Sequence, residues 1–182
     1  VEISGGSISG TKTNGSGSKV VYKGADPTNP VWGTLYNDLE ISSGKVEFTD
    51  SVTVNRNLIN NAETYIANAK SINVKGDVTS TGDITGGGTL NFNGSSDQTF
   101  TPNNMSYPAV TTTSDGSLTI SGDLNAVSVN TTCTTYIADS IITTGNQTYS
   151  GAVELNGNTS LNAPLIQFSS AVDGPYTLTT NG

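Results

Sequence analysis

Residues 145–163, "GNQTYSGAVELNGNTSLNA", and residues 164–182, "PLIQFSSAVDGPYTLTTNG", share one layout. Written one above the other, they bring three pairs into line at one common separation: Tyr149 on Phe168, Ala152 on Ala171 and Val153 on Val172. A fixed offset of this kind is typical of proteins built from stacked coils, in which each coil contacts only its neighbours. We therefore expect the members of each pair to lie one above the other in adjacent coils.

The composition favours short β-strands over helices. Ser, Thr, Asn and Gly dominate the 182 residues, and charged residues make up only 12%. Short segments alternate apolar and polar residues, as in Leu90-Asn91-Phe92, which places one side of a strand on a core and the other in water. The predicted class is all-β.

A stacked coil explains this pattern better than a β-sandwich, because hairpins do not require residue spacing to repeat. Longer likenesses also occur, such as that between "TYIANA", which contains Tyr65, and "TYIADS", which contains Tyr136. They suggest long copies of three to four coils each and about nine coils in all, at roughly 20 residues per coil. The sequence predicts a right-handed parallel β-helix, or β-solenoid, of about nine coils, with a β-sandwich as the alternative.

Two segments depart from the regular pattern. Residues 57–70 carry apolar residues at helical spacing, but their likeness to "TTCTTYIADS" favours strand or irregular structure. Pro27 and Pro30 in "GADPTNP" predict a loop that leaves the coil. Neither segment resembles a linker, so we expect one β-helical repeat domain over residues 1–182, as a segment of a larger protein.

Charge and residue types argue against several function classes. The net charge is −8 and Arg56 is the one arginine, which disfavours nucleic-acid binding. No apolar stretch approaches the roughly 20 residues of a membrane span, so membrane insertion is not expected. Without histidine, the usual triads and histidine metal sites are missing. We expect no cofactor, and Cys133 as a small core-facing or half-buried residue.

Two stretches resemble a known family. Residues 138–182, "ADSIITTGNQTYSGAVELNGNTSLNAPLIQFSSAVDGPYTLTTNG", resemble the β-strand repeats of filamentous-haemagglutinin-like exoproteins. Residues 88–124, "GTLNFNGSSDQTFTPNNMSYPAVTTTSDGSLTISGDL", are similar to another repeat of large bacterial surface proteins. The resemblance implies a right-handed parallel β-helix in a secreted or surface-displayed bacterial adhesin, which forms a long fibre and contributes to attachment or biofilm.

The serious enzymatic alternative is a β-helix polysaccharide lyase or hydrolase, in which carboxylates on adjacent coils hold calcium or act as acid and base. The candidate carboxylates are Asp77, Asp83, Asp97, Asp115, Asp123, Asp139 and Asp173. Most of them stand beside Gly or Ser, where an aspartate hydrogen-bonds its own turn. Arg56 and Lys75 are far from most of them in sequence. We therefore expect structural aspartates, no catalytic residues and no metal site.

Aromatic residues near the proline-containing loops are the candidate binding residues. Trp32, Tyr36 and Tyr107, with Tyr22 beside them, are expected to be exposed and able to stack on sugar rings or insert into a partner; alternatively, Trp32 plugs the core. Ice binding is another non-adhesive hypothesis, and it would need an outward column of Thr-x-Thr at one coil spacing. Thr111 and Thr132 would form two of its rungs, but the next rung, near "GAVEL", has no threonine.

The sequence thus predicts a non-enzymatic adhesin segment, extracellular or on the bacterial surface, that extends and presents a binding surface. The expected partners are host or matrix glycans or proteins, and other copies of the chain by end-to-end association, because uncapped coils expose strand edges. The alternatives are a carbohydrate-active β-helix enzyme and a self-assembling fibre subunit.

Overall fold

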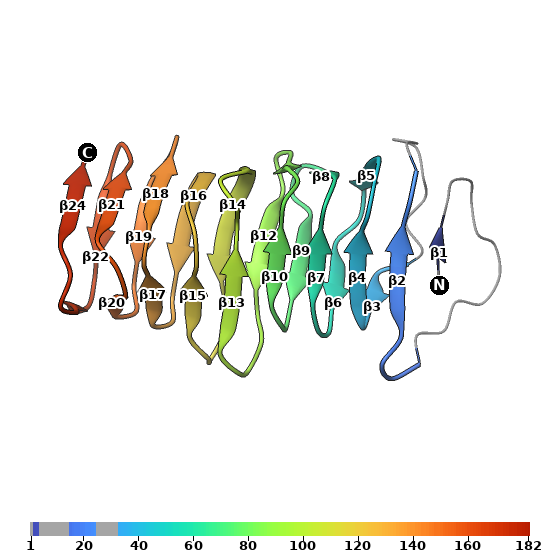
Figure 1. Ribbon diagram of the computed structural model, residues 1–182, viewed down its shortest axis with the longest axis horizontal. Helices are drawn as coiled ribbons and strands as arrows, with labels where there is room; N and C mark the ends of the chain where they lie inside the picture. The colour runs from blue at the N-terminus through green and yellow to red at the C-terminus, as the bar shows by residue number, and fades with distance from the viewer. Residues whose placement is uncertain (1, 4–14, 25–32) are drawn as a thin grey trace.

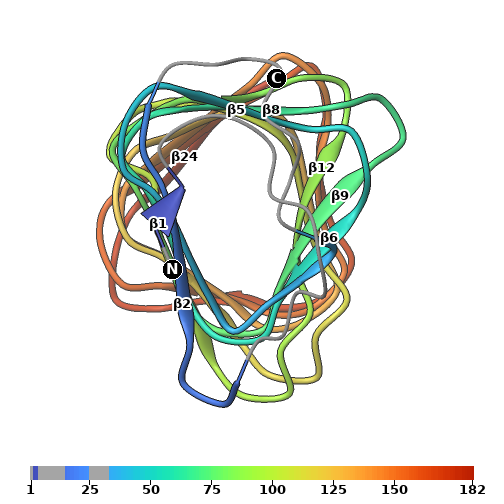
Figure 2. The same cartoon turned by 90° about the vertical axis from the view of Figure 1, so that its right-hand side faces the viewer.

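The protein is a parallel β-solenoid in the computed structural model, which describes residues 2–3, 15–24 and 33–182. The fixed offset between the two closing repeats is the length of one coil. The chain winds through about 8 turns around one axis, and the coils stack side by side along it (Figures 1 and 2). The predicted all-β solenoid is confirmed. The sandwich alternative is wrong, because sandwiches are built from antiparallel strands and these strands pair in parallel.

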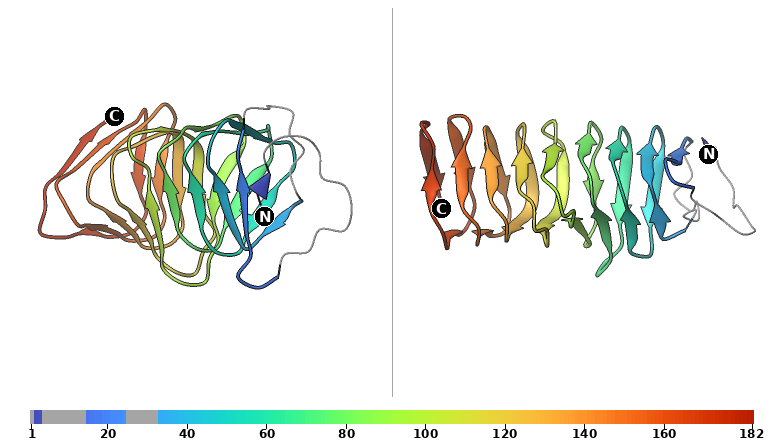
Figure 3. Two further views of the ribbon diagram at one scale, coloured as in Figure 1. Left: turned by 45° about the vertical axis from the view of Figure 1, so that its right-hand side comes forward. Right: turned by 90° about the horizontal axis from the view of Figure 1, so that it is seen from below.

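The first face of the solenoid is a 10-stranded sheet. Its strands, in spatial order, are β1 (Glu2–Ile3), β2 (Lys19–Tyr22), β4 (Asp38–Ile41), β7 (Leu58–Asn60), β10 (Val78–Ser80), β13 (Gln98–Thr101), β15 (Leu118–Ile120), β17 (Thr135–Ile137), β20 (Val153–Leu155) and β23 (Val172–Asp173). Strands from successive coils lie next to one another in this sheet, so the face runs the length of the solenoid (Figure 3).

The other two faces begin as separate sheets. The second face starts with β5 (Lys45–Phe48), β8 (Glu63–Ile66) and β11 (Ile84–Thr85), and the third with β3 (Leu35–Tyr36), β6 (Val52–Val54), β9 (Ser71–Val74) and β12 (Thr89–Phe92). Two longer strands, β14 (Ser106–Thr112) and β16 (Leu124–Thr131), then continue both faces. The start of β16 pairs with β18 (Ser140–Thr143), which leads to β21 (Thr159–Asn162) and β24 (Leu178–Asn181). The end of β16 pairs with β19 (Gln147–Tyr149), which leads to β22 (Ile166–Phe168).

The core consists of inward ladders of like residues. One ladder on the first face stacks apolar side chains that are all buried: Val20, Leu39, Leu58, Val78, Phe100, Ile120, Ile137 and Leu155. Each such side chain contributes about 1.5–3 kcal/mol when removed from water. No single strand is long enough to bury a face alone, so stability comes from stacking coil on coil.

Two of the three pairs predicted from the closing repeat are confirmed by the strand register. Tyr149 pairs with Phe168 and Val153 with Val172. The rings of Tyr149 and Phe168 lie 5.3 Å apart between centroids and 15° from parallel. The segment of helical spacing forms strands β7 and β8, as expected, with Ala69 at a φ of 59° after them.

The predicted number of coils is close to the observed one: the solenoid has about 8 turns where about nine coils were expected. Coil length varies, from 17 residues between Ile120 and Ile137 to 22 between Val78 and Phe100. One prediction about the repeats is wrong. The likeness between "TYIANA" and "TYIADS" is not a structural repeat, because Tyr65 lies in β8 on the second face and Tyr136 in β17 on the first. The loop predicted at Pro27 and Pro30 lies outside the described residues.

Polar residues form columns on the outside of the third face. Thr53, Asn73, Asn91 and Thr111 are in register, and Thr111 is followed by Asn130. The middle of the column is hydrogen-bonded: Asn91 Nδ2 donates to Asn73 Oδ1 at 2.9 Å, and Thr111 Oγ1 donates to Asn91 Oδ1 at 3.0 Å. The register assumed for an ice-binding column is therefore wrong, because Thr111 is stacked with Asn130 and not with Thr132.

Candidate functional site

Most of the candidate aspartates bind the backbone of the following coil. Asp77 Oδ1 accepts a hydrogen bond from Thr99 N at 2.8 Å, Asp83 Oδ1 from Ser106 N at 2.8 Å, and Asp123 Oδ1 from Ser140 N at 3.1 Å. Asp97 Oδ1 accepts from both Ser117 N (3.0 Å) and Ser117 Oγ (2.8 Å). The structural role predicted for these carboxylates is confirmed, but they fasten adjacent coils together and do not bond their own turns.

Asp173 alone among the seven follows the expected local pattern, since its Oδ1 accepts from Gly174 N at 2.7 Å. Asp115 and Asp139 take no hydrogen bond or ion pair within the described part of the chain. The basic residues are engaged elsewhere: Arg56 pairs with Asp38, and Lys75 Nζ donates to Asn55 Oδ1 at 3.0 Å. Among the described residues, neither Arg56 nor Lys75 is therefore paired with any of the seven candidate aspartates.

The Asp97 contacts predict an acid-dependent loss of stability. The hydrogen bonds from the backbone and then the side chain of Ser117 lower the pKa of the Asp97 carboxyl below its ordinary value of 3.8. A carboxyl with a lowered pKa stabilises the fold above its unfolded-state pKa, and this contribution is lost as the pH falls through the folded-state pKa. We expect Asp97→Asn to lower the Tm at pH 7, and the difference from wild type to shrink below about pH 4.

Thermal unfolding followed by far-UV circular dichroism, from pH 7 to pH 2, measures this difference. Asp139→Asn is the control, because Asp139 is an exposed aspartate without a bonded partner in the described chain. The control is expected to match wild type at every pH. Equal Tm values for Asp97→Asn and wild type at pH 7 would contradict the prediction.

The aromatic residues predicted to be exposed lie in the core. Tyr22 and Tyr36 are buried, and their hydroxyl oxygens are 3.1 Å apart. Tyr107 is 3% exposed; its hydroxyl donates to Pro102 O, and burial raises the pKa of its phenol. The exposure expected for these three was wrong, because each occupies an inward rung of its strand. Trp32 lies outside the described residues.

A polar groove opens on the first face where the corner leading into it changes length. The corner between the third and first faces comprises residues 93–97 and 113–117 in two successive coils, but only 132–134 in the next. The first long corner, 93–97, is supported from within by buried Gln98, whose Oε1 accepts a hydrogen bond from Gly94 N (2.8 Å). The Nε2 of Gln98 ties this corner to the preceding coil by donating to Val74 O (3.0 Å) and Gly76 O (2.6 Å). The groove lies at the step from long corner to short.

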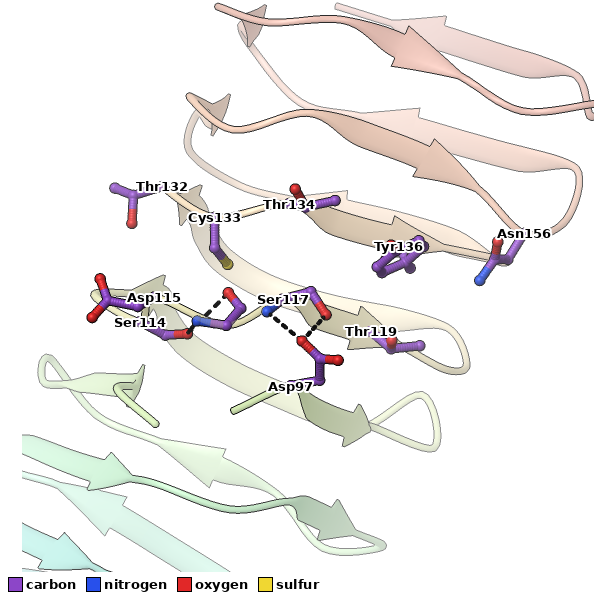
Figure 4. A pocket seen from close by; sticks show the side chains of 11 residues that line it. Asp97, Ser114, Asp115, Ser117, Thr119, Thr132, Cys133, Thr134, Tyr136 and Asn156 are labelled. Carbon is purple, nitrogen blue, oxygen red and sulfur yellow. Dashed lines mark hydrogen bonds between the residues drawn. The ribbon is translucent and has the colours of Figure 1, made fainter. Parts of the chain in front are cut away.

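The groove has a volume of about 750 Å³, within the range of roughly 300–1,000 Å³ of small-molecule sites. It is shallow and open along the side of the solenoid (Figure 4). Its lining is almost entirely polar: Asp97, Ser114, Asp115, Gly116, Ser117, Thr119, Thr132, Cys133, Thr134, Tyr136 and Asn156. It contains two carboxylates and no Lys or Arg, so its charge is negative.

Several polar side chains of the groove have no protein partner. Thr119, Thr134, Tyr136 and Asn156 make no side-chain hydrogen bond within the described residues. The first three stand on β15 and β17 or just before β17, and Asn156 follows β20 one coil further on. These groups are therefore available to a ligand, unlike the bonded Asn and Thr of the third face.

Cys133 is buried, as predicted, and its thiol is free. Its Sγ lies 3.5 Å from Thr112 Oγ1. In the ranges that the structure describes, no cluster of three or more acidic or cysteine side chains is arranged to hold a metal ion. There is also no helix that could cross a membrane among these residues.

Sequence reasoning missed Tyr136 as a groove residue, although a signal was present. Alternation within "TYI" puts Thr135 and Ile137 on one side of the strand and Tyr136 on the other. Both neighbours are buried, which turns the tyrosine outward. The other candidate aromatics stand in or beside proline-containing loops, where inward and outward positions cannot be assigned by alternation.

Comparisons of the chain with family models, with curated proteins and with solved structures find no match. The architecture therefore rests on the strand register described above. The likeness to filamentous-haemagglutinin-like repeats remains a likeness of sequence pattern alone.

Proposed function

We propose that this chain is a non-enzymatic segment of a secreted or surface-displayed bacterial adhesin, which extends as a β-solenoid and presents a binding surface. The observation that carries the proposal is the polar groove, which opens on the side wall of a stacked coil and keeps several hydrogen-bonding groups without protein partners among the described residues. A ligand approaching the side of an extended molecule reaches these groups directly. The proposed location is extracellular or on the cell surface.

A carbohydrate-active enzyme is a weaker hypothesis than a non-enzymatic adhesin segment. Four of the seven candidate aspartates are used as acceptors for the backbone of the next coil. A lyase also requires a basic group beside its acids to stabilise developing negative charge, and the groove lining has no Lys or Arg. These features favour binding over turnover.

The test is a binding array of host-matrix proteins and glycans, with cleavage of the glycans followed in the same wells. We expect saturable binding to at least one class without any cleavage product. Cleavage would overturn the proposal in favour of a carbohydrate-active enzyme. A lack of both binding and cleavage would overturn it in favour of a spacer or fibre element.

Self-association is a second candidate function, favoured by the last coil. Ile166, Phe168 and Leu178 are only partly buried there, and Val172 is 37% exposed. Strands β23 and β24 end their sheets, so each is paired on one side only among the described strands. For the chain of residues 2–182 in isolation, such an edge accepts a further strand, and a second copy of the chain can supply it.

We expect the chain to show a mass above 18.7 kDa in light scattering as its concentration rises. Val172→Lys should restore the monomer, because a lysine on an edge strand opposes strand addition. Val127→Lys, at an exposed position away from the last coil, is the control and should associate like wild type. A monomer at every concentration would contradict this second function.

A further inference from the structure

Tyr136 gives the groove a flat aromatic surface. Strand β17 holds Thr135 and Ile137 in the core, so the Tyr136 side chain extends outward. It stands in register between Thr119 of β15 and Glu154 of β20. The ring lies in the groove, with the Thr119 side chain on the preceding coil and the Asn156 side chain near one end of the ring (Figure 4). Tyrosine offers a rigid contact area with both apolar and polar parts, at a low cost in conformational entropy.

Side chains that can donate or accept hydrogen bonds surround the Tyr136 ring. Thr119 and Thr134 supply hydroxyls, and Asn156 supplies a carbonyl acceptor and an amide donor. None of them bonds to another side chain among the described residues. An aromatic surface surrounded by such groups matches a sugar ring, which has an apolar face of C–H groups and an edge of hydroxyls.

We propose that the groove around Tyr136 is a binding site for neutral oligosaccharides. One sugar ring stacks on the Tyr136 ring, and its hydroxyls bond to Thr119, Thr134 and Asn156. The carboxylates of Asp97 and Asp115 select against anionic sugars, since no basic residue lines the groove. This proposal rests on the proposed binding function, and it specifies the class of ligand and the place on the solenoid where the ligand binds.

The chain contains its own control for the stacking residue. Tyr65 has the same local sequence as Tyr136, "TYIA", and the same outward orientation between buried Thr64 and Ile66. It lies on the second face, in register with Glu47 and Thr85, and does not line the groove. Replacing Tyr65 therefore removes an equivalent ring from an equivalent strand without touching the site.

The experiment titrates the full chain with lactose, maltose, cellobiose and diacetylchitobiose, and follows backbone amides by two-dimensional NMR. At least one of these neutral sugars is expected to shift the amides of Thr119, Tyr136 and Asn156. For that sugar, Tyr136→Ala should raise the Kd about tenfold or more, and Asn156→Ala several-fold. Tyr136→Phe should stay within about threefold of wild type, because the ring is kept, and Tyr65→Ala should have no effect.

Sialyllactose tests the charge argument, because it is lactose with a carboxylate added. It should bind more weakly than lactose if lactose is the ligand, and Asp115→Asn should reduce the difference. The proposal is overturned if no neutral sugar shifts the groove amides, or if Tyr136→Ala and Tyr65→Ala behave alike.

These failures can be told apart from failure of the binding function itself. If the chain binds a matrix protein or a glycan on the array and Tyr136→Ala binds equally well, the adhesive function stands and the groove is not its site. If wild type binds nothing on the array and no sugar shifts the groove amides, both fail together.

Discussion

Replacing Phe100 by alanine is expected to lower the free energy of unfolding by about 3–5 kcal/mol. Phe100 is fully buried in β13 and stands in the inner ladder between Val78 and Ile120. Its ring centroid lies 5.3 Å from that of Phe92 and 5.0 Å from that of Tyr107, the latter edge to face. The substitution removes these contacts and leaves a cavity between two coils, which strands paired on both sides cannot close.

Urea unfolding followed by far-UV circular dichroism measures this loss. Ile142→Ala is the control, since that side chain is 47% exposed on β18, and we expect a change within about 0.5 kcal/mol. Phe100→Leu should fall between the two. A loss below about 1 kcal/mol for Phe100→Ala would mean that the coils relax around the gap and that the ladder is not the main source of stability.

The inner ladders could be predicted from sequence where the coil has constant length. Tyr149 and Phe168 are stacked as the fixed offset requires, because the corners of the last two coils are equally long. The prediction failed where coil length changes. Between Asp97 and Ser117 the separation is 20 residues, and between Asp123 and Ser140 it is 17. A register assumed constant across that step is wrong by three residues (20 − 17), an odd number, which turns inward positions outward.

The groove depends on this change of length, which explains why sequence reasoning did not find it. Its two sides come from corners of different coils, 113–117 and 132–134, which have no recognisable likeness to each other. Tyr107 illustrates the same difficulty, since its place in a proline-containing stretch suggested exposure but it occupies an inward rung opposite Ala126. Local pattern predicts which residues can face a core; the stacking of coils decides which do.

Aspartates at the ends of the coils show a second limit. Their place beside Gly and Ser predicted a structural role, and most have one. The partner could not be read from sequence, because it is a backbone N–H in the next coil and not one in the same turn. In a solenoid the nearest neighbour of a residue at a corner is the residue one coil away, and side-chain bonds follow that neighbour.

The close spacing of coils predicts a second large effect, at Gly86. Gly86 has a φ of +110°, and a Cβ added there would overlap the carbonyl oxygen of Ile66 in the preceding coil. That oxygen also accepts the hydrogen bond from Gly88 N, at 3.2 Å, so it cannot move away without loosening the corner. Backbone strain and overpacking each cost about 1–3 kcal/mol, so Gly86→Ala should lower the free energy of unfolding by about 2–6 kcal/mol.

Substitutions at two other glycines distinguish the cost of backbone strain from the cost of steric overlap. Gly17 has a φ of +80° with nothing within 4 Å of an added Cβ, so Gly17→Ala should show the backbone term alone, about 1 kcal/mol. Gly33 has open space as well, and no positive φ, so Gly33→Ala should leave stability unchanged or raise it by about 0.4–1 kcal/mol. If Gly86→Ala cost no more than Gly17→Ala in urea unfolding, the coils would have to separate freely at this corner. Tight stacking of the coils would then not restrict the size of the side chain at this corner.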